Sequence, residues 1–163
     1  MSSARRFLTF AVACCAALLL VAAPASADDK SVSDAWDSED AAFTQLGKSE
    51  RREYRAWEKR GFTRDPKLLK IYRRGETLSR KVIAALEAQQ PSTPQGAQAR
   101  DLAISSTKHF AEHFVVLRKF VRTIRADDET AGRKIGKEAD RLLKLTESEG
   151  EQAKAIFVQL GLD

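Results

Sequence analysis

The two histidines of this chain have a spacing that could support metal chemistry. His109 and His113 are four residues apart, so on a helix both imidazoles lie on one side, one turn apart. Two imidazoles placed in this way can chelate a divalent transition metal. The same spacing also suits two packing residues whose ring nitrogens bond to a carbonyl or a carboxylate. The sequence leaves both interpretations open.

Two glutamates could complete such a site, because Glu50 and Glu149 each fall within an apolar stripe at helical spacing. A carboxylate in a core costs several kcal/mol unless it is paired, metal-bound or protonated. Counting a rise of about 1.5 Å per residue along antiparallel helices puts both within about two turns of the height of the histidines. We therefore predict a polar layer of His109, His113, Glu50 and Glu149. It would hold a divalent transition metal as its cofactor or pair with itself, and glutamates that reach solvent at the stripe edge are the alternative.

The segment from His109 to His113 reads H-F-A-E-H and resembles the H-x-x-E-H pattern of inverted zinc proteases over these five residues. Those enzymes need a third ligand from a distant helix in a larger α/β framework, and only fifty residues follow His113. The sequence offers no set of nucleophile, base and oxyanion donors. We therefore predict that the protein is not an enzyme.

A cluster of cations forms the other candidate site. Residues 51–81 carry twelve basic and four acidic residues, whereas residues 28–50 carry seven acidic and two basic ones. Such a surface could bind an anionic envelope component by charge, although a solvated helix face has the same composition. The candidate residues flank one apolar stripe and are Lys67, Lys70, Arg73, Arg74, Arg80 and Lys81.

Four segments with helical periodicity position these residues. Asp65 and Pro66 form an N-cap followed by proline at the first helical position, and the stretch 90–96 is the clearest loop. Burial of four apolar stripes predicts an all-α fold, an antiparallel up-down-up-down four-helix bundle. No glycine or proline separates the last two helices, so one long rod is the alternative there. The expected helices are about Ser33–Arg60, Pro66–Gln89, Ala97–Arg125 and Glu129–Leu160.

The N-terminus has the layout of a secretory signal peptide. Arg5 and Arg6 precede an apolar run of 17 residues, and small residues end at Ala27. This pattern predicts a signal-peptide helix over residues 1–27, cleaved after Ala27. An uncleaved membrane anchor and a lipid modification of Cys14 are the alternatives.

Composition bounds the remaining domain, residues 28–163. Both cysteines and the single methionine leave with the signal, which excludes disulfides, thiolate nucleophiles and sulfur metal ligands. The net charge falls from +5 to +3, which does not favour nucleic acid.

We therefore expect an exported protein, periplasmic or secreted, with no transmembrane span after cleavage. The predicted function is a non-catalytic binding or interaction module of the cell envelope, whose partner is an unknown protein or an anionic envelope component. The alternative is a periplasmic or extracellular metal-binding or metal-sensing protein that uses His109 and His113.

Overall fold

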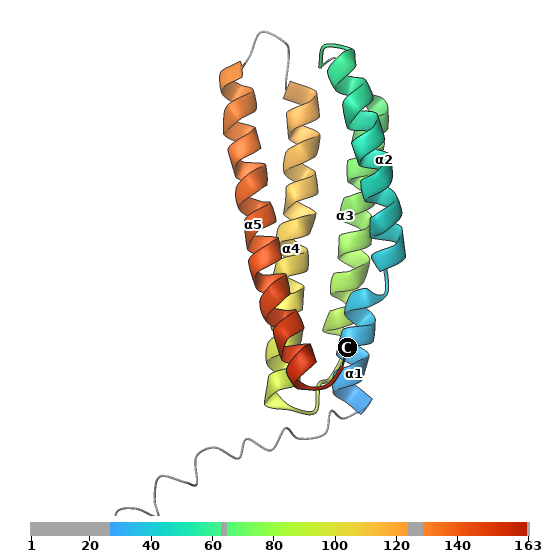
Figure 1. Ribbon diagram of the computed structural model, residues 1–163, viewed down its shortest axis with the longest axis vertical. Coiled ribbons are helices and arrows are strands. Elements are labelled where there is room, and N and C mark those ends of the chain that lie inside the picture. Colours follow the sequence, from blue (N-terminus) through green and yellow to red (C-terminus); the bar gives the residue numbers. More distant parts are fainter. Residues whose placement is uncertain (1–26, 63–64, 124–128, 163) are drawn as a thin grey trace, which may run out of the picture.

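A computed structural model describes residues 27–62, 65–123 and 129–162 of the chain (Figure 1). These residues contain no β-strand, which confirms the predicted all-α class. No helix within them is long and apolar enough to cross a membrane. Apart from Ala27, the predicted signal peptide lies outside them. The helices are α1 (Ala27–Asp37), α2 (Asp40–Lys59), α3 (Pro66–Glu87), α4 (Pro94–Thr123) and α5 (Glu129–Gln159).

The helix predicted from Ser33 to Arg60 is broken in two, so that prediction is wrong. The Ser38 hydroxyl donates to the Ala35 carbonyl at 2.7 Å, and Glu39, the N-cap of α2, has φ −115° and ψ 11°. Serine and aspartate side chains compete for nearby backbone hydrogen bonds and favour helix ends over helix interiors. The sequence from 37 to 40 reads Asp-Ser-Glu-Asp, so the chain turns between α1 and α2.

Capping side chains fix the starts of α3 and α4. Asp65 has extended backbone geometry and accepts hydrogen bonds from the amides of Lys67 (2.8 Å) and Leu68 (3.0 Å), which confirms the predicted N-cap. The Thr93 hydroxyl accepts from the Gly96 amide at 2.9 Å. Since Thr93 caps the helix, α4 begins at Pro94, three residues before the predicted start.

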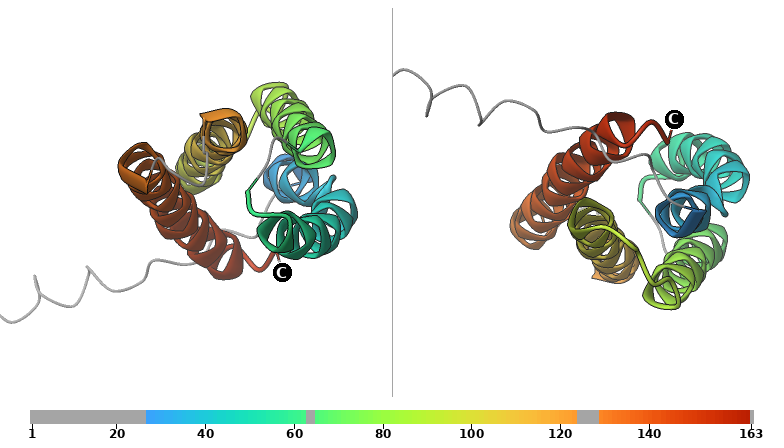
Figure 2. Two further views of the ribbon diagram at one scale, coloured as in Figure 1. Left: turned by 90° about the horizontal axis from the view of Figure 1, so that it is seen from above. Right: turned by 90° about the horizontal axis from the view of Figure 1, so that it is seen from below.

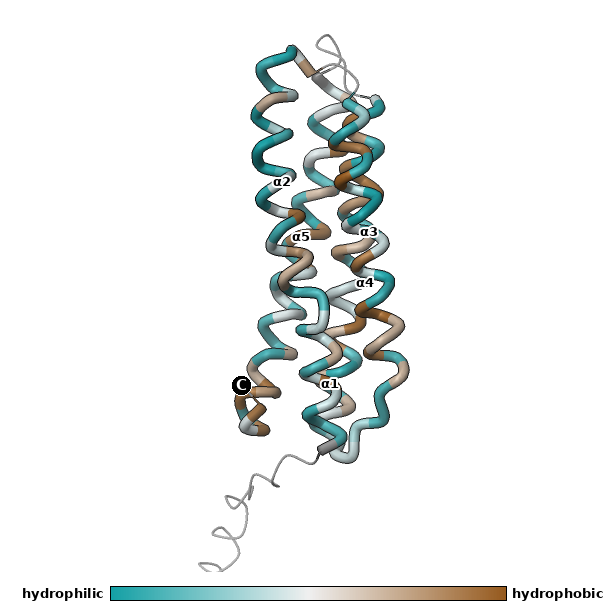
Figure 3. The backbone as a smooth tube through the Cα atoms, turned by 90° about the vertical axis from the view of Figure 1, so that its right-hand side faces the viewer, coloured by the Kyte–Doolittle hydropathy of each residue, from teal (hydrophilic) through white to brown (hydrophobic). Residues whose placement is uncertain are grey.

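The long helices lie side by side (Figures 1 and 2). α4 packs along α5 and α3, α2 packs against α3, and α1 contacts α3 and α4. Because α4 and α5 pack along each other, the alternative of one long rod is wrong. Hydrophobic and hydrophilic residues alternate along each helix (Figure 3).

The core has two parts along this length. Val32, Leu86 and Phe157 belong to the part near α1, whereas Trp57 and Phe114 belong to the part at the other end of α2. Because α2 packs against α3 and α5 against α4, the face between α2 and α5 is the one least covered by helix packing.

Candidate binding cleft and polar layer

A cleft of about 610 Å³ opens between α1 and α2 on one side and α5 on the other. Four helices contribute aromatic rings to its walls. Trp36 of α1 and Phe157 of α5 have ring centroids 5.6 Å apart, and Phe43 of α2 and Phe110 of α4 are 5.4 Å apart. The volume lies within the range of about 300–1,000 Å³ typical of small-molecule sites. The cleft is therefore large enough and apolar enough to hold an organic ligand.

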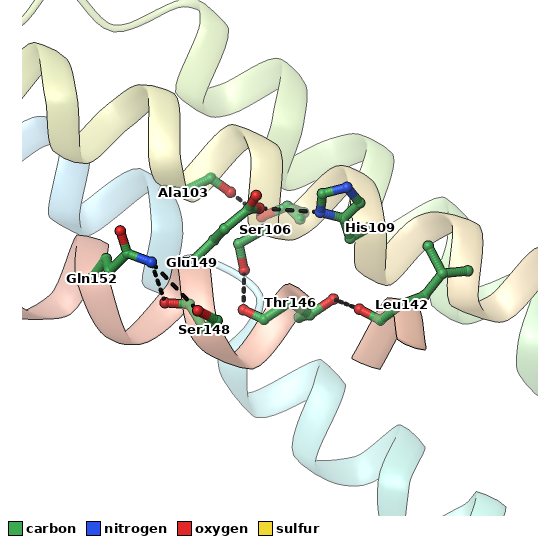
Figure 4. A network of polar contacts seen from close by, with 9 residues as sticks. Ala103, Ser106, His109, Leu142, Thr146, Ser148, Glu149 and Gln152 are labelled. Carbon is green, nitrogen blue, oxygen red and sulfur yellow. Dashed lines mark hydrogen bonds and ion pairs between the residues drawn. The ribbon is translucent and has the colours of Figure 1, made fainter. Parts of the chain in front are cut away.

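A glycine of α5 keeps this cleft open. A Cβ atom on Gly150 would lie 3.3 Å from the Ser106 hydroxyl and 3.8 Å from the Trp36 ring. The Ser106 hydroxyl donates to the Thr146 carbonyl at 2.8 Å (Figure 4), and the Thr107 hydroxyl donates to the Ala103 carbonyl at 2.7 Å. The hydroxyls of Ser33 and Thr146, which also line the cleft, likewise donate to backbone carbonyls.

Carboxylates surround the entrance. Asp37 and Asp40 on one side and Glu147 and Glu151 on the other line the cleft, with Lys154 as the one cation among its lining residues. All five side chains are exposed, and none of them forms an ion pair within the ranges described above. Partial burial and the charges of neighbouring Asp40 and Asp34 raise the pKa of Asp37, and Lys154 and Lys30 offset this in part.

The structure brings together His109 and Glu149, two of the four predicted metal ligands. Nδ1 of His109 in α4 lies 3.1 Å from Oε2 of Glu149 in α5 (Figure 4), with side chains 26% and 22% exposed. Nδ1 of His113 lies 2.9 Å from the Ala139 carbonyl oxygen of α5. Each imidazole therefore uses its Nδ1 atom for a hydrogen bond to an oxygen atom of α5.

Glu50 belongs to a neighbouring polar contact between α2 and α3. Burial raises its pKa, and a hydrogen bond from the Tyr72 hydroxyl and the charge of His113 lower that pKa by less. Tyr72 is 1% exposed, and its own pKa is raised by burial and by Glu50. Within the described ranges, no three histidine, cysteine or acidic side chains are placed to hold one metal ion. The four residues predicted to form one polar layer therefore take part in separate contacts. His109 contacts Glu149, His113 contacts the Ala139 carbonyl, and Glu50 contacts Tyr72.

The Glu50 carboxyl makes stability depend on pH. Because burial raises its pKa, the folded protein keeps this proton at pH values at which the unfolded chain has lost it. The stabilisation is fully present below the ordinary value of 4.5 and is lost as pH rises through the folded pKa. Glu50→Gln mimics the protonated form, so we expect it to raise the free energy of unfolding more at pH 7 than at pH 4.

Urea unfolding at pH 4, 5, 6 and 7 measures this difference. Glu58→Gln, on the exposed side of the same helix, is the matched control and should change stability by the same small amount throughout. A Glu50→Gln effect that is equal at all four pH values would contradict a raised pKa of this partly buried carboxyl.

The six predicted anion-binding residues all lie on α3 and are exposed. Two of them are occupied by acidic partners: Arg80 lies 2.9 Å from Glu76, and Lys81 lies 3.7 Å from Glu39. The other four form no ion pair with any described residue and sit in the first half of α3, at the end remote from α1 (Figure 1). These four, called the basic surface below, are Lys67, Lys70, Arg73 and Arg74.

The cleft was not predicted from the sequence. Its aromatic residues belong to apolar stripes, which predict core packing equally well. A glycine inside an amphipathic helix is a signal of close approach or open space, and Gly150 was the residue that could have indicated it. Comparison with protein-family models, with curated proteins and with solved structures finds no match to this chain.

Proposed function

We propose that this chain is an exported, non-catalytic binding module: an antiparallel up-down-up-down four-helix bundle released when a signal-peptide helix is cleaved after Ala27. The main support for a binding role is the cleft between α1 and α2 on one side and α5 on the other, which is lined by aromatic rings. Ligand sites in proteins are mostly apolar concavities with a few polar groups, and they form readily between the helices of bundles. Export rests on the sequence of residues 1–27.

The groups that line the cleft support binding rather than catalysis. A nucleophile needs a base within about 2.6–3.2 Å that is itself oriented by a third group. The hydroxyls of Ser106 and Thr107 instead donate to backbone carbonyls. The described residues that line the cleft include no histidine.

Filling the cleft is expected to weaken the binding of an apolar probe. N-phenyl-1-naphthylamine is neutral and fluoresces strongly in apolar surroundings, so its titration into the protein measures occupancy of the cleft. We expect Gly150→Leu to weaken its binding at least about tenfold, equivalent to about 1.4 kcal/mol, because the new side chain extends toward Ser106 and Trp36. Gly150→Ala should weaken it less.

Gly136→Leu is the matched control, because Gly136 lies in the same helix and a Cβ there meets nothing within 4 Å. This variant should bind the probe like the unmodified protein. Equal affinity in Gly150→Leu and Gly136→Leu, with both variants folded by circular dichroism, would refute binding in the cleft.

The basic surface on α3 is proposed to lie against an anionic envelope component. Its four cations have no acidic partner among the described residues, so their charge is available to an outside anion. The basic surface lies in the first half of α3, whereas the cleft is lined by α1, the start of α2 and the second half of α5. The two therefore lie toward opposite ends of the long helices, whose course is shown in Figure 1. A module bound through the basic surface would thus keep its cleft accessible.

Metal binding is the second candidate function. The hydrogen bond that each imidazole makes to α5 favours it. Histidines that bind metals commonly donate their other ring nitrogen to a carboxylate or a backbone carbonyl, which fixes the tautomer and the ring orientation. Nδ1 of His109 faces Glu149, and Nδ1 of His113 faces the Ala139 carbonyl. A metal would then be bound through Nε2 of each ring, and Glu149 would orient His109 instead of acting as a ligand.

Calorimetric titration with Zn²⁺, Cu²⁺ and Ni²⁺ tests this second candidate. We expect binding that is lost in His113→Ala and weakened about 10–100-fold in Glu149→Gln, as for other partners of metal-binding histidines. Glu50→Gln should change the affinity less than Glu149→Gln, because Glu50 is hydrogen-bonded to Tyr72 and not to either imidazole. A flat titration with all three ions would remove the metal function.

A further inference from the structure

We infer that the ligand of the cleft is an amphipathic organic cation, with an apolar body between the aromatic rings and a positive headgroup at the acidic entrance. This inference rests on the proposed binding function and adds the chemical class of the ligand. It depends on three features of the cleft: the charge of its rim, the rings beside that charge, and its size.

The rim selects for positive charge. Asp37, Asp40, Glu147 and Glu151 face the entrance with Lys154 as the single cation, and none of the four carboxylates has an ion-pair partner among the described residues. This concentration of negative charge occurs in a chain whose net charge is +5. A cleft lined by one sign of charge concentrates ligands of the opposite sign and repels those of like sign.

Aromatic rings and carboxylates line the same part of the cleft. Its lining includes Trp36 and Asp37 at the end of α1 and Asp40 and Phe43 at the start of α2. A cationic headgroup at this position would meet carboxylate oxygens and aromatic faces together, which is the arrangement that favours quaternary ammonium groups. Burial and repulsion from Asp40 and Asp34 raise the pKa of Asp37, and a bound cation would offset the repulsion.

The dimensions of the cleft suit a small molecule. Its volume of about 610 Å³ lies within the range of about 300–1,000 Å³ that is typical of small-molecule sites. An extended alkyl or aryl group fits this space. Along α5 the lining residues run from Thr146 to Phe157, a distance of about 17 Å at 1.5 Å per residue, which is close to the length of a dodecyl chain.

Three amphiphiles with a twelve-carbon chain test the inference by displacing N-phenyl-1-naphthylamine from the protein recovered after expression of the full chain. Dodecyltrimethylammonium is cationic, dodecyldimethylamine oxide has no net charge at pH 7.5, and dodecanoate is anionic. All are used below their critical micelle concentrations. We expect the cation to displace the probe at a concentration at least about tenfold lower than the neutral amphiphile, and dodecanoate to be the weakest. Added salt should reduce the advantage of the cation.

Variants that neutralise carboxylates show which residues produce the preference for the cation. The double variant Asp40→Asn/Glu151→Gln should shift the midpoint of the cation toward that of the neutral amphiphile and leave the neutral midpoint unchanged. Glu112→Gln/Asp140→Asn removes the same total charge from exposed positions outside the lining and should keep the preference.

The possible results distinguish a failure of the cationic-ligand inference from a failure of the binding function. Equal midpoints for the cation and the neutral amphiphile, or a lower midpoint for dodecanoate, would overturn the cationic ligand while the binding cleft stands. A 14-residue amphipathic peptide of lysine and leucine that displaces the probe more strongly than the cation would overturn the small-molecule occupant. No binding of the probe or of any amphiphile would refute the binding function itself.

Discussion

Asp29→Ala is expected to lower the free energy of unfolding by about 3 kcal/mol. Asp29 is 0% exposed, and its carboxylate joins the start of α1 to the loop before α4. Oδ1 accepts from the amides of Ser92 (2.9 Å) and Thr93 (3.3 Å), and Oδ2 accepts from the Thr93 hydroxyl (2.6 Å). Alanine would remove the acceptor of these partly buried donors, and a donor left unpaired away from water costs about 1–3 kcal/mol.

Urea unfolding followed by circular dichroism measures this loss. Asp34→Ala is the matched control in the same helix, because Asp34 is 63% exposed and, among the described residues, forms an ion pair with Lys30 alone, one turn away. Such an exposed pair is worth about 0.3–0.5 kcal/mol. Asp29→Asn keeps one acceptor oxygen and should fall between the two. An Asp29→Ala protein as stable as Asp34→Ala would show that this carboxylate does not hold α1 in place.

Gly75→Ala is expected to cost about 2–3 kcal/mol through overpacking, although alanine favours a helix by about 0.5–1 kcal/mol over glycine. A Cβ on Gly75 of α3 would lie 2.5–2.7 Å from ring atoms of Phe114 in α4. Phe114 is 2% exposed and has little room to move away. Thermal and urea unfolding of the variant measure the loss.

Two further variants identify the cause of this effect. Gly136→Ala has no neighbour within 4 Å of its new Cβ, so it should show the helix-propensity gain alone, about 0.5–1 kcal/mol. In a double-mutant cycle, Phe114→Leu should recover part of the Gly75→Ala loss, because the smaller side chain removes the ring that the methyl group meets. Additive losses in the cycle would contradict the clash.

Periodicity and capping chemistry predicted most of the helical structure. Residue types with local physical preferences, such as Asp65 and Pro66, placed the start of α3 correctly. The break at Ser38 and Glu39 was missed because the apolar stripe continues from Trp36 to Phe43 across it. Periodicity reports which residues face the core and does not report whether the backbone between them stays helical.

The polar layer was predicted in part. Helical spacing and a height count placed Glu149 near His109, and these side chains meet at 3.1 Å. Neither method could show that His113 binds the Ala139 carbonyl or that Glu50 lies beside Tyr72. Those contacts depend on the rotation of each helix about its axis and on side-chain rotamers, which are fixed only when the helices pack.

The sequence by itself determined that the described residues form amphipathic helices, because 3.6-residue periodicity and helix caps are local properties of the chain. Only the tertiary structure decided that α2 and α5 leave an aromatic cleft between them, that Asp29 is buried against the loop at Ser92, and that carboxylates from two distant segments share one rim. The physical reason is that each of these features joins residues about 60 to more than 100 positions apart. Such contacts are set by the packing of whole helices, which the pattern within any one helix does not specify.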